Sequence, residues 1–294
     1  MKPVMTYTII LFYKYTHIKD TEALKEAQLK LCRELELKGR MIIAEEGVNA
    51  TFEGTNENIE KYVKKLTSDK RFKGIHIKRS EGIGDAFPKL SVKVRPEIVS
   101  LRLGEEDLHP GEVTGRRLTP EELHEWFQKN EDFEIVDMRN DYEYKSGHFR
   151  GSRLLPMRNF RDLPKVKDKI EDIKDKKVLA VCTGGVRCEK ATGYLKKQGF
   201  ENIYQLDGGI VSYMEKYPNQ DFEGKLYVFD KRITMGFETD SPEHKVVGKC
   251  DKCGATSDMY ADCKNKSCAN HFIACKDCRD ENGLAFCPEE KVEA

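Results

Sequence analysis

The sequence lacks an excess of charge of either sign, and it lacks any long apolar stretch. Its 294 residues include 51 Lys plus Arg and 51 Asp plus Glu, so the formal net charge is zero. This balance excludes a uniformly basic nucleic-acid coat and an acidic disordered chain, although it leaves room for a local basic patch. The longest run without a charged residue, Pro3–Tyr13, has 11 residues, whereas a helix that spans a bilayer needs about 20. We therefore expect no membrane segment.

The same run lacks the small-residue cleavage site of a signal peptide. Its polar and apolar side chains alternate, which predicts a strand, and we expect a cytoplasmic protein. Seven of the ten cysteines lie between residues 250 and 287. Such crowding in a cytoplasmic chain indicates metal ligation rather than disulfides.

The predicted elements divide the chain into three segments, of which the first covers residues 1–105. Its pattern is β-α-β-β-α-β, the ferredoxin-like motif of one sheet covered by two helices. Asp20 is the expected cap of the first helix, which contains Cys32 as a packing residue. A turn at Gly47-Val48-Asn49 is expected between the second and third strands.

The second segment, residues 114–218, alternates strands and helices, which predicts a mostly parallel sheet. Its first helix opens with the capping box Thr119-Pro120-Glu121-Glu122. Ile135–Met138 and Val178–Val181 are short apolar runs typical of buried parallel strands. The third segment, residues 219–294, has few large apolar residues and needs a staple to fold. The expected class is α/β: a ferredoxin-like domain, a parallel α/β domain and a Cys-rich tail.

The strongest catalytic signal follows the strand Val178–Val181, and it reads Cys182-Thr183-Gly184-Gly185-Val186-Arg187. Two glycines allow successive amide groups to converge on the sulfur, and the next helix adds its positive dipole end, so both favour the nucleophilic thiolate. Arg187 adds a fixed positive charge and a donor fork. We expect Cys182 in the crevice where ligands bind such sheets. A passive cysteine beside an ordinary turn is the alternative.

Several motifs resemble the rhodanese domain. They are Asp137-Met138-Arg139 with Tyr142-Glu143, Gly147–Ser152, the Cys182 loop and Asp207-Gly208-Gly209. The loop of cysteine plus five residues is the rhodanese length, whereas dual-specificity phosphatases place arginine at the position that Cys188 occupies here; this counts against phosphatase activity. Cys188 is a candidate resolving thiol for Cys182, and a passive role at the helix start fits equally well. A rhodanese domain alone implies a sulfurtransferase or persulfide carrier, which stays the alternative function.

Motifs outside that domain widen the resemblance. Ala44–Thr51, Lys93–Val99, the segment Cys182–Lys190 and the Cys-rich tail resemble the oxygen-dependent tRNA uridine-34 hydroxylases over nearly the whole chain. This resemblance implies an oxidoreductase in which Cys182 is essential and O₂ is the co-substrate. It further implies that the anticodon loop of tRNA is the partner and that 5-hydroxyuridine at the wobble position is the product.

The sequence carries no motif of an oxygen-activating cofactor. It has no His-x-Asp/Glu pair of the kind that anchors a non-haem iron triad, and no G-x-G-x-x-G after a predicted strand to mark a flavin site. One hypothesis needs no metal: the Cys182 thiolate adds to C6 of the uracil, and C5 becomes carbanion-like and reacts with O₂. A persulfide on Cys182, and redox action by the tail cysteines, are the alternatives.

Basic residues are concentrated in the first segment. Residues 61–79 contain eight Lys or Arg against a single acid, Asp69, a pattern that suits a phosphate backbone; a solvated lysine-rich face is the alternative. The candidate tRNA-binding residues are Lys61, Lys64, Lys65, Lys70, Arg71, Lys73, Lys93 and Arg95. Tyr7, Tyr13 and Phe52 are candidates for stacking on unpaired bases, with packing in the core as the alternative.

The tail contains two chelating pairs of cysteines. Cys250 with Cys253 and Cys275 with Cys278 are separated by 21 residues, which predicts a tetrahedral zinc site. The candidates for a second, interleaved site are Cys263, Cys268, His271 and Cys287. Bound zinc is then the staple that the segment needs, and an iron–sulfur cluster is the alternative.

Overall fold

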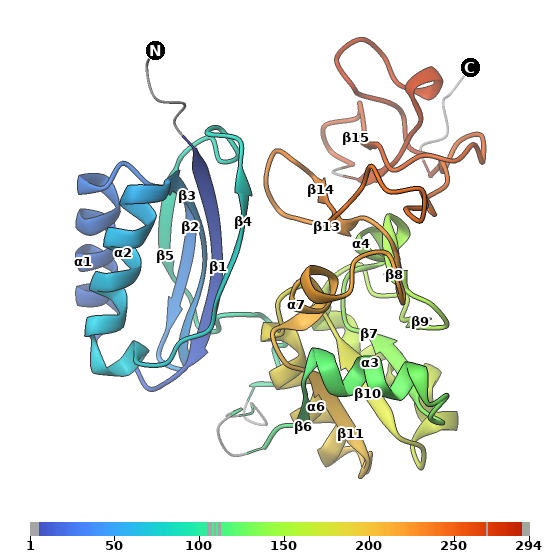
Figure 1. The fold of residues 1–294 in the computed structure, drawn as a ribbon, viewed down its shortest axis with the longest axis horizontal. Helices are drawn as coiled ribbons and strands as arrows, with labels where there is room; N and C mark the ends of the chain where they lie inside the picture. Colours follow the sequence, from blue (N-terminus) through green and yellow to red (C-terminus); the bar gives the residue numbers. More distant parts are fainter. Residues whose placement is uncertain (1–5, 105–107, 109, 111–112, 269, 290–294) are drawn as a thin grey trace. The chain divides into compact units, whose positions relative to one another are not determined.

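The computed structural model describes residues 6–104, 108, 110, 113–268 and 270–289, and Figure 1 shows its elements. The chain forms two compact units, Met1–Gly115 with Glu189–Gln198, and Arg116–Cys188 with Gly199–Ala294. The Cys-rich tail thus lies in the same unit as the parallel sheet. In the part of the chain that the structure describes, no helix is long and apolar enough to cross a membrane.

The N-terminal unit confirms the predicted ferredoxin-like motif. Its sheet has the order β4-β1-β3-β2-β5, and α1 (Thr21–Glu34) and α2 (Asn56–Ser68) cover one face of it (Figure 1). The strands are β1 (Tyr7–Tyr15), β2 (Lys38–Ala44), β3 (Gly47–Thr55), β4 (Ile77–Gly82) and β5 (Leu90–Val94). β5 runs parallel to β2 and adds a fifth strand to the motif, and the short 3-10 helix η1 (Lys70–Phe72) follows α2.

The core of this unit lies between the sheet and the two helices. Phe52 is fully buried there, with its ring centroid 5.3 Å from that of Tyr62, so it is a core residue and not a stacking platform. Asp20 caps α1 as predicted, because its Oδ1 accepts from the amide of Ala23 at 2.9 Å. Cys32 is buried, and burial raises its pKa to about 12. It is therefore a packing residue.

The predicted turn at Gly47-Val48-Asn49 is wrong. β2 pairs directly with β3 from Ala44 opposite Gly47, so Glu45 and Glu46 form the turn and the three predicted residues belong to β3. Gly47 has φ +148°, and a Cβ there would lie 2.1 Å from the carbonyl oxygen of Lys14. The glycine is needed for the close approach of β1 and not for a turn.

The second unit contains a parallel sheet of order β6-β11-β10-β7-β9. Its strands are β6 (Arg116–Leu118), β7 (Glu134–Asp137), β9 (Arg153–Leu154), β10 (Val178–Val181) and β11 (Ile203–Leu206). The helices along this part of the chain are α3 (Pro120–Gln128), α4 (Asp141–Lys145), α5 (Leu163–Val166), α6 (Val186–Lys197) and α7 (Gly209–Lys216), with 3-10 turns at η3 (Phe160–Asp162) and η4 (Lys167–Ile173). The predicted capping box is present, since Thr119 and Glu122 exchange hydrogen bonds.

The tail is built from short pairs of strands. β12 (Phe222–Gly224) pairs with β8 (Gly147–Phe149), β13 (Leu226–Tyr227) with β14 (Thr234–Met235), and β15 (Tyr260–Asp262) with β16 (His271–Ile273), before the 3-10 turn η5 (Lys276–Cys278). Tyr260 donates a hydrogen bond to the carbonyl of Tyr142, and Lys145 pairs with Asp251 at 2.7 Å. Both interactions join the tail to α4.

Candidate active site and metal-binding clusters

The loop between β10 and α6 holds Cys182 in a fixed backbone cradle. The amide of Gly185 points at the Cys182 sulfur with N–S 3.2 Å, and Gly185 adopts φ +99°, which favours glycine. The start of α7 clamps the loop, because the amide of Ile210 donates to the Cys182 carbonyl at 2.9 Å. A Cβ on Gly209 would lie 2.6 Å from the backbone of Gly184. The glycines on both sides therefore allow this close packing.

The cradle stabilises the anionic form of Cys182. Burial by itself raises the pKa of this thiol, but a hydrogen bond from Cys188, the positive charge of Arg187 and backbone amides of the loop outweigh burial and lower the pKa from 9.0 to about 6. The thiolate is thus the main form at neutral pH, and the thiolate is the nucleophile. This electrostatic arrangement is the one that the Gly-Gly loop and the helix start predicted.

The structure corrects the expected position of Cys182 in an open crevice. Cys182 is fully buried, as are Val181 before it and Cys188 on α6. The strand end places the sulfur at the carboxyl edge of the sheet as predicted, but the loop curls back over it and α7 packs against the loop. A substrate atom can reach the sulfur only after side chains around it move.

Arg187 does not present a free donor fork. Its two terminal nitrogens lie 2.6 and 2.9 Å from the two carboxylate oxygens of Glu143, and one of them also donates to the Thr183 hydroxyl at 3.3 Å. Glu143 is fully buried. The charge of Arg187 still acts on Cys182, but its hydrogen bonds are used within the protein. Spacing could not show this, because 44 residues separate the partners.

A second buried ion pair supports Glu143. Asp137, at the end of β7, and Arg139 are both fully buried and 2.7 Å apart. The Arg139 guanidinium also donates to the carbonyls of Glu143 and Gly147 at 3.2 and 2.7 Å. Arg139 therefore holds the backbone of α4, and α4 holds the carboxylate that engages Arg187. The sequence shows these residues only as members of the rhodanese-like motif. Its one indication of their role is that two carboxylates and two arginines belong to the same set of motifs as Cys182.

Cys188 lies against Cys182. It is the third residue of α6, it is fully buried, and its thiol donates a hydrogen bond to the Cys182 sulfur. Burial, followed by the hydrogen bond to Cys182, raises the pKa of Cys188 well above 9.0. Cys188 therefore keeps its proton while Cys182 loses its own, and a resolving role for Cys188 stays a prediction.

Within the N-terminal unit, which includes Glu189–Gln198, Lys190 pairs with acids from two distant parts of the sequence. The Lys190 ammonium is fully buried and lies 2.8 Å from Glu46 and 2.9 Å from Glu97. Burial lowers its pKa, but the hydrogen bonds to the two carboxylates outweigh burial and raise it. Lys190 therefore stays charged and neutralises two acids that would otherwise repel each other.

The four cysteines of the predicted first metal site come together. The sulfurs of Cys250, Cys253, Cys275 and Cys278 all lie within 4.8 Å of one another, with Cys253 and Cys275 3.6 Å apart. Zinc–sulfur bonds of about 2.3 Å give sulfur–sulfur edges of about 3.8 Å in a tetrahedron. The donor set therefore fits a tetrahedral metal ion and is compatible with zinc.

The second cluster contains three of the four expected ligands. Cys263, Cys268 and Cys287 converge within the same limit, with Cys268 and Cys287 3.5 Å apart. His271 is not part of the cluster: its Nδ1 lies 2.7 Å from Asp262, and its ring stacks on Tyr260 at 4.9 Å. Strand pairing causes this, because β15 and β16 place His271 opposite Asp262.

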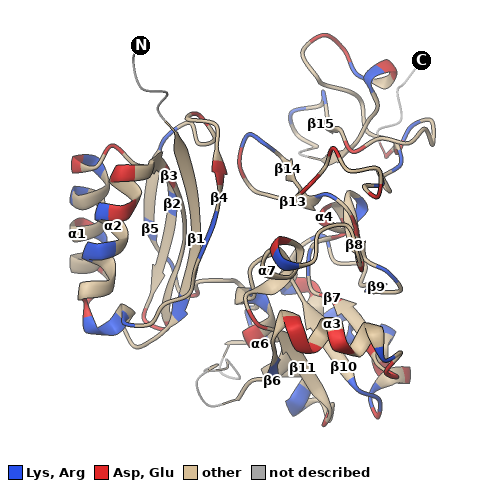
Figure 2. Cartoon of the chain, viewed as in Figure 1, with Lys and Arg blue, Asp and Glu red and all other residues tan. Residues whose placement is uncertain are grey.

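The structure divides the predicted tRNA-binding residues into two sets. Lys61, Lys64 and Lys65 are exposed residues of α2, and Lys70, Arg71 and Lys73 follow just after it. Figure 2 shows Lys and Arg positions on α2 and near its end. Lys93 on β5 and Arg95 lie at the opposite edge of the sheet from β4. Lys61 pairs with Glu57 and Arg71 with Asp69, both at 2.6 Å. Among the described residues, Lys64 and Lys65 form no ion pair.

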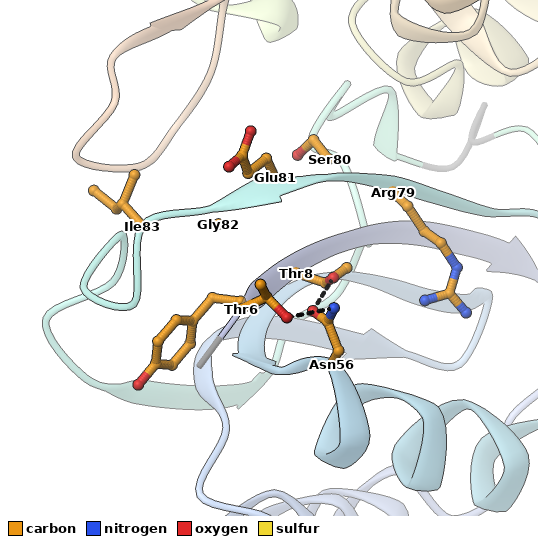
Figure 3. A pocket seen from close by; sticks show the side chains of 9 residues that line it. Thr6, Thr8, Asn56, Arg79, Ser80, Glu81, Gly82 and Ile83 are labelled. Atoms are coloured by element: carbon orange, nitrogen blue, oxygen red, sulfur yellow. Dashed lines mark hydrogen bonds between the residues drawn. The ribbon is translucent and has the colours of Figure 1, made fainter. Parts of the chain in front are cut away.

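A pocket of about 620 Å³ lies in the N-terminal unit where β1, β4 and the start of α2 meet. Figure 3 shows the Asn56 amide between the hydroxyls of Thr6 and Thr8, while Arg79 pairs with Glu60 at 2.7 Å. The other residues that line the pocket are Tyr7, Ser80, Glu81, Gly82 and Ile83. The wall combines polar and apolar groups and contains no thiol, so the pocket does not compete with Cys182 as the reaction site.

The chain resembles known protein families along most of its length. The family model described as "UPF0176 acylphosphatase like domain" matches residues 7–98, "Rhodanese-like domain" matches 119–216, and "Rhodanase C-terminal" matches 223–290. The tRNA uridine(34) hydroxylase of Bacillus licheniformis is 43% identical over 287 residues, 97% of this chain and 88% of that protein. The protein of that name from Bacillus cereus strain B4264 is 41% identical over 293 residues, 99% and 90% of the two chains. Among solved structures, a rhodanese-like domain from Anabaena is 22% identical and covers 37% of this chain and 78% of its own at a TM-score of 0.32.

We expect protein purified without chelators to contain up to two equivalents of bound metal, with zinc favoured by the all-sulfur donors. Cys278→Ser should remove about one equivalent and increase hydrogen exchange in residues 250–287, because structural zinc contributes on the order of 10 kcal/mol to such folds. Cys32→Ser is the matched control and should keep all the metal. Elemental analysis that finds no metal in the wild type would contradict the assignment.

Proposed function

The chain belongs to the tRNA uridine(34) hydroxylase family, and we propose that it hydroxylates C5 of uridine 34 in tRNA, with O₂ as co-substrate and Cys182 as the reacting group. The observation that carries this proposal is the cradle of Cys182. It lowers the pKa of this thiol to about 6, so the nucleophilic thiolate is the main form at neutral pH. The relatives named for this activity match 97% and 99% of this chain. On this basis the enzyme is an oxidoreductase that acts on the anticodon loop.

The proposed chemistry uses the nucleophilicity of the thiolate. The Cys182 sulfur adds to C6 of the uracil, which places carbanion character on C5, and C5 then forms a bond to O₂. Arg187 and Cys188 lower the basicity of the sulfur, so it is also a good leaving group when the C6–S bond breaks. Because the sulfur is fully buried, tRNA binding has to open the loop region before the base can enter.

Sulfur transfer is the second candidate, and the match of residues 119–216 to the rhodanese-like domain favours it. A rhodanese that uses an anionic donor such as thiosulfate needs a cationic group free to bind it. In this chain the Arg187 fork is already engaged by Glu143. This pairing favours the hydroxylase over a thiosulfate-dependent transferase.

Mass spectrometry of nucleosides from U34-containing tRNA tests the proposed function. Wild-type protein with O₂ should convert uridine 34 to 5-hydroxyuridine, and Cys182→Ser should slow the reaction on the order of 10³-fold or more, because the covalent step is lost. Cys32→Ser should react normally. Wild-type levels of 5-hydroxyuridine from Cys182→Ser would contradict the role of Cys182 as the reacting group. A persulfide on Cys182 without any hydroxylation would favour the sulfurtransferase.

For tRNA binding we propose α2 and the segment after it. Lys64 and Lys65 are exposed on α2, and in the described structure no carboxylate neutralises them. Their field is screened within about 8 Å at physiological salt, so they act only on phosphates that dock directly. Lys61 and Arg71 contribute less, because each already has an acidic partner.

The double variant Lys64→Glu/Lys65→Glu should weaken tRNA binding and flatten its salt dependence by about 0.7–0.9 log units for each phosphate that the protein no longer neutralises. The matched control is Lys30→Glu/Arg33→Glu on α1, which changes the net charge equally and lies on the same face of the sheet. Affinity for tRNA is measured at two salt concentrations. If both variants bind alike, α2 is only a solvated face.

A further inference from the structure

The thiols of Cys182, in the loop before α6, and of Cys188, at the start of α6, are arranged as a pair. Cys188 and Cys182 are both fully buried, and the Cys188 thiol donates its hydrogen bond to the Cys182 sulfur. The backbone draws them together, since the Cys188 amide donates to the Gly185 carbonyl at 3.0 Å while the Gly185 amide points at the Cys182 sulfur at 3.2 Å. One tight loop therefore holds two thiols against each other.

The proposed hydroxylation requires electrons as well as oxygen. One oxygen atom of O₂ enters the C5–O bond and the other becomes water, and this stoichiometry needs two electrons beyond those of the C5–H bond. A dithiol that becomes a disulfide supplies two electrons. We propose that Cys182 and Cys188 act as a redox dithiol that supplies the two electrons of each hydroxylation and ends the turnover as a disulfide. This inference rests on the proposed function.

The overall reaction balances. Uridine, O₂ and two thiols give 5-hydroxyuridine, water and one disulfide. One C5–H and two S–H bonds break, and their three hydrogens end in the new hydroxyl and in water. The sulfurs are oxidised by two electrons in total, and O₂ accepts these together with two from the C5–H bond. Two equivalents of an external thiol then reduce the Cys182–Cys188 disulfide by successive exchange, which returns both protons to the pair and releases the external thiols as their own disulfide.

A route through the Cys182 adduct meets this balance. O₂ adds to C5 of the adduct and takes up a proton, which gives a hydroperoxide. The Cys188 sulfur takes the outer oxygen, which leaves a C5 hydroxyl and a sulfenic acid on Cys188. Loss of the C5 proton and of the C6–S bond releases 5-hydroxyuridine and Cys182. Cys182 then attacks the Cys188 sulfur, and water leaves as the disulfide forms.

The other cysteines are committed elsewhere. Cys32 is packed in the core of the N-terminal unit, and the remaining seven form the two sulfur clusters of the tail. Cys188 is thus the thiol that the structure places on Cys182. Its proton is also held firmly, because burial and the hydrogen bond to Cys182 raise its pKa, so it stays reduced until an oxidised group forms beside it.

The test is a single turnover with fully reduced, full-length protein and tRNA in aerated buffer without added thiol. The wild type should make about one equivalent of 5-hydroxyuridine, because one dithiol supplies two electrons, and peptide mass spectrometry should find an equal amount of the Cys182–Cys188 disulfide. Without tRNA, or without O₂, neither should form. Cys188→Ser keeps a hydrogen-bond donor but cannot be oxidised, so the stoichiometric product should be absent; Cys32→Ser should behave as the wild type.

Two results would overturn the inference: a full equivalent of product while Cys182 and Cys188 stay reduced, or an unchanged yield from Cys188→Ser. The wild-type peptide measurement decides alone if the Cys188 variant folds poorly. Failure of the proposed function is recognised separately, because the wild type would then make no 5-hydroxyuridine even with excess dithiol present.

Discussion

The site depends on the burial of a negative sulfur among groups whose charges are already paired. Asp137 with Arg139 and Glu143 with Arg187 form two buried ion pairs around Cys182. Each pair is neutral as a whole, and the arginine of the second pair is the one whose charge acts on the thiolate. Loss of one partner would leave a buried charge unpaired, at a cost of about 3–5 kcal/mol. The loop backbone, α4 and the start of α6 are therefore held in one arrangement by the charges that the thiolate needs.

The tail is stabilised by a different kind of interaction. Its apolar core is small, and the tail contains two clusters of cysteine sulfurs. The tail is also bound to α4, the helix that carries Glu143, through Tyr260 and through the ion pair of Lys145 with Asp251. A metal ion in the first cluster would order the chain beside Asp251, and in this way the tail supports the helix that positions the active-site carboxylate.

Local patterns predicted the elements, whereas long-range pairing decided the details of the site. Apolar runs located β10 at Val178–Val181, and the capping box located α3, because both depend on neighbouring residues. The predicted turn at Gly47 is wrong because the glycine is required by a close approach to the Lys14 carbonyl on β1, which is distant in sequence. The occupied fork of Arg187 and the exclusion of His271 from the second cluster also follow from partners elsewhere in the chain, Glu143 and Asp262. Spacing along one sequence does not contain those pairings. The domain boundaries at 105, 114 and 218 stay predictions.

The central claim is that the fold stabilises Cys182 as a thiolate at neutral pH. The most direct measurement is the ultraviolet absorbance of the thiolate as a function of pH, taken as the difference between wild type and Cys182→Ser so that the tail cysteines cancel. Because the pKa of the folded thiol lies below its ordinary value, the anion should persist as the pH falls and should be lost only near pH 6. A difference titration with its midpoint at or above 9.0, the ordinary value, would contradict the account.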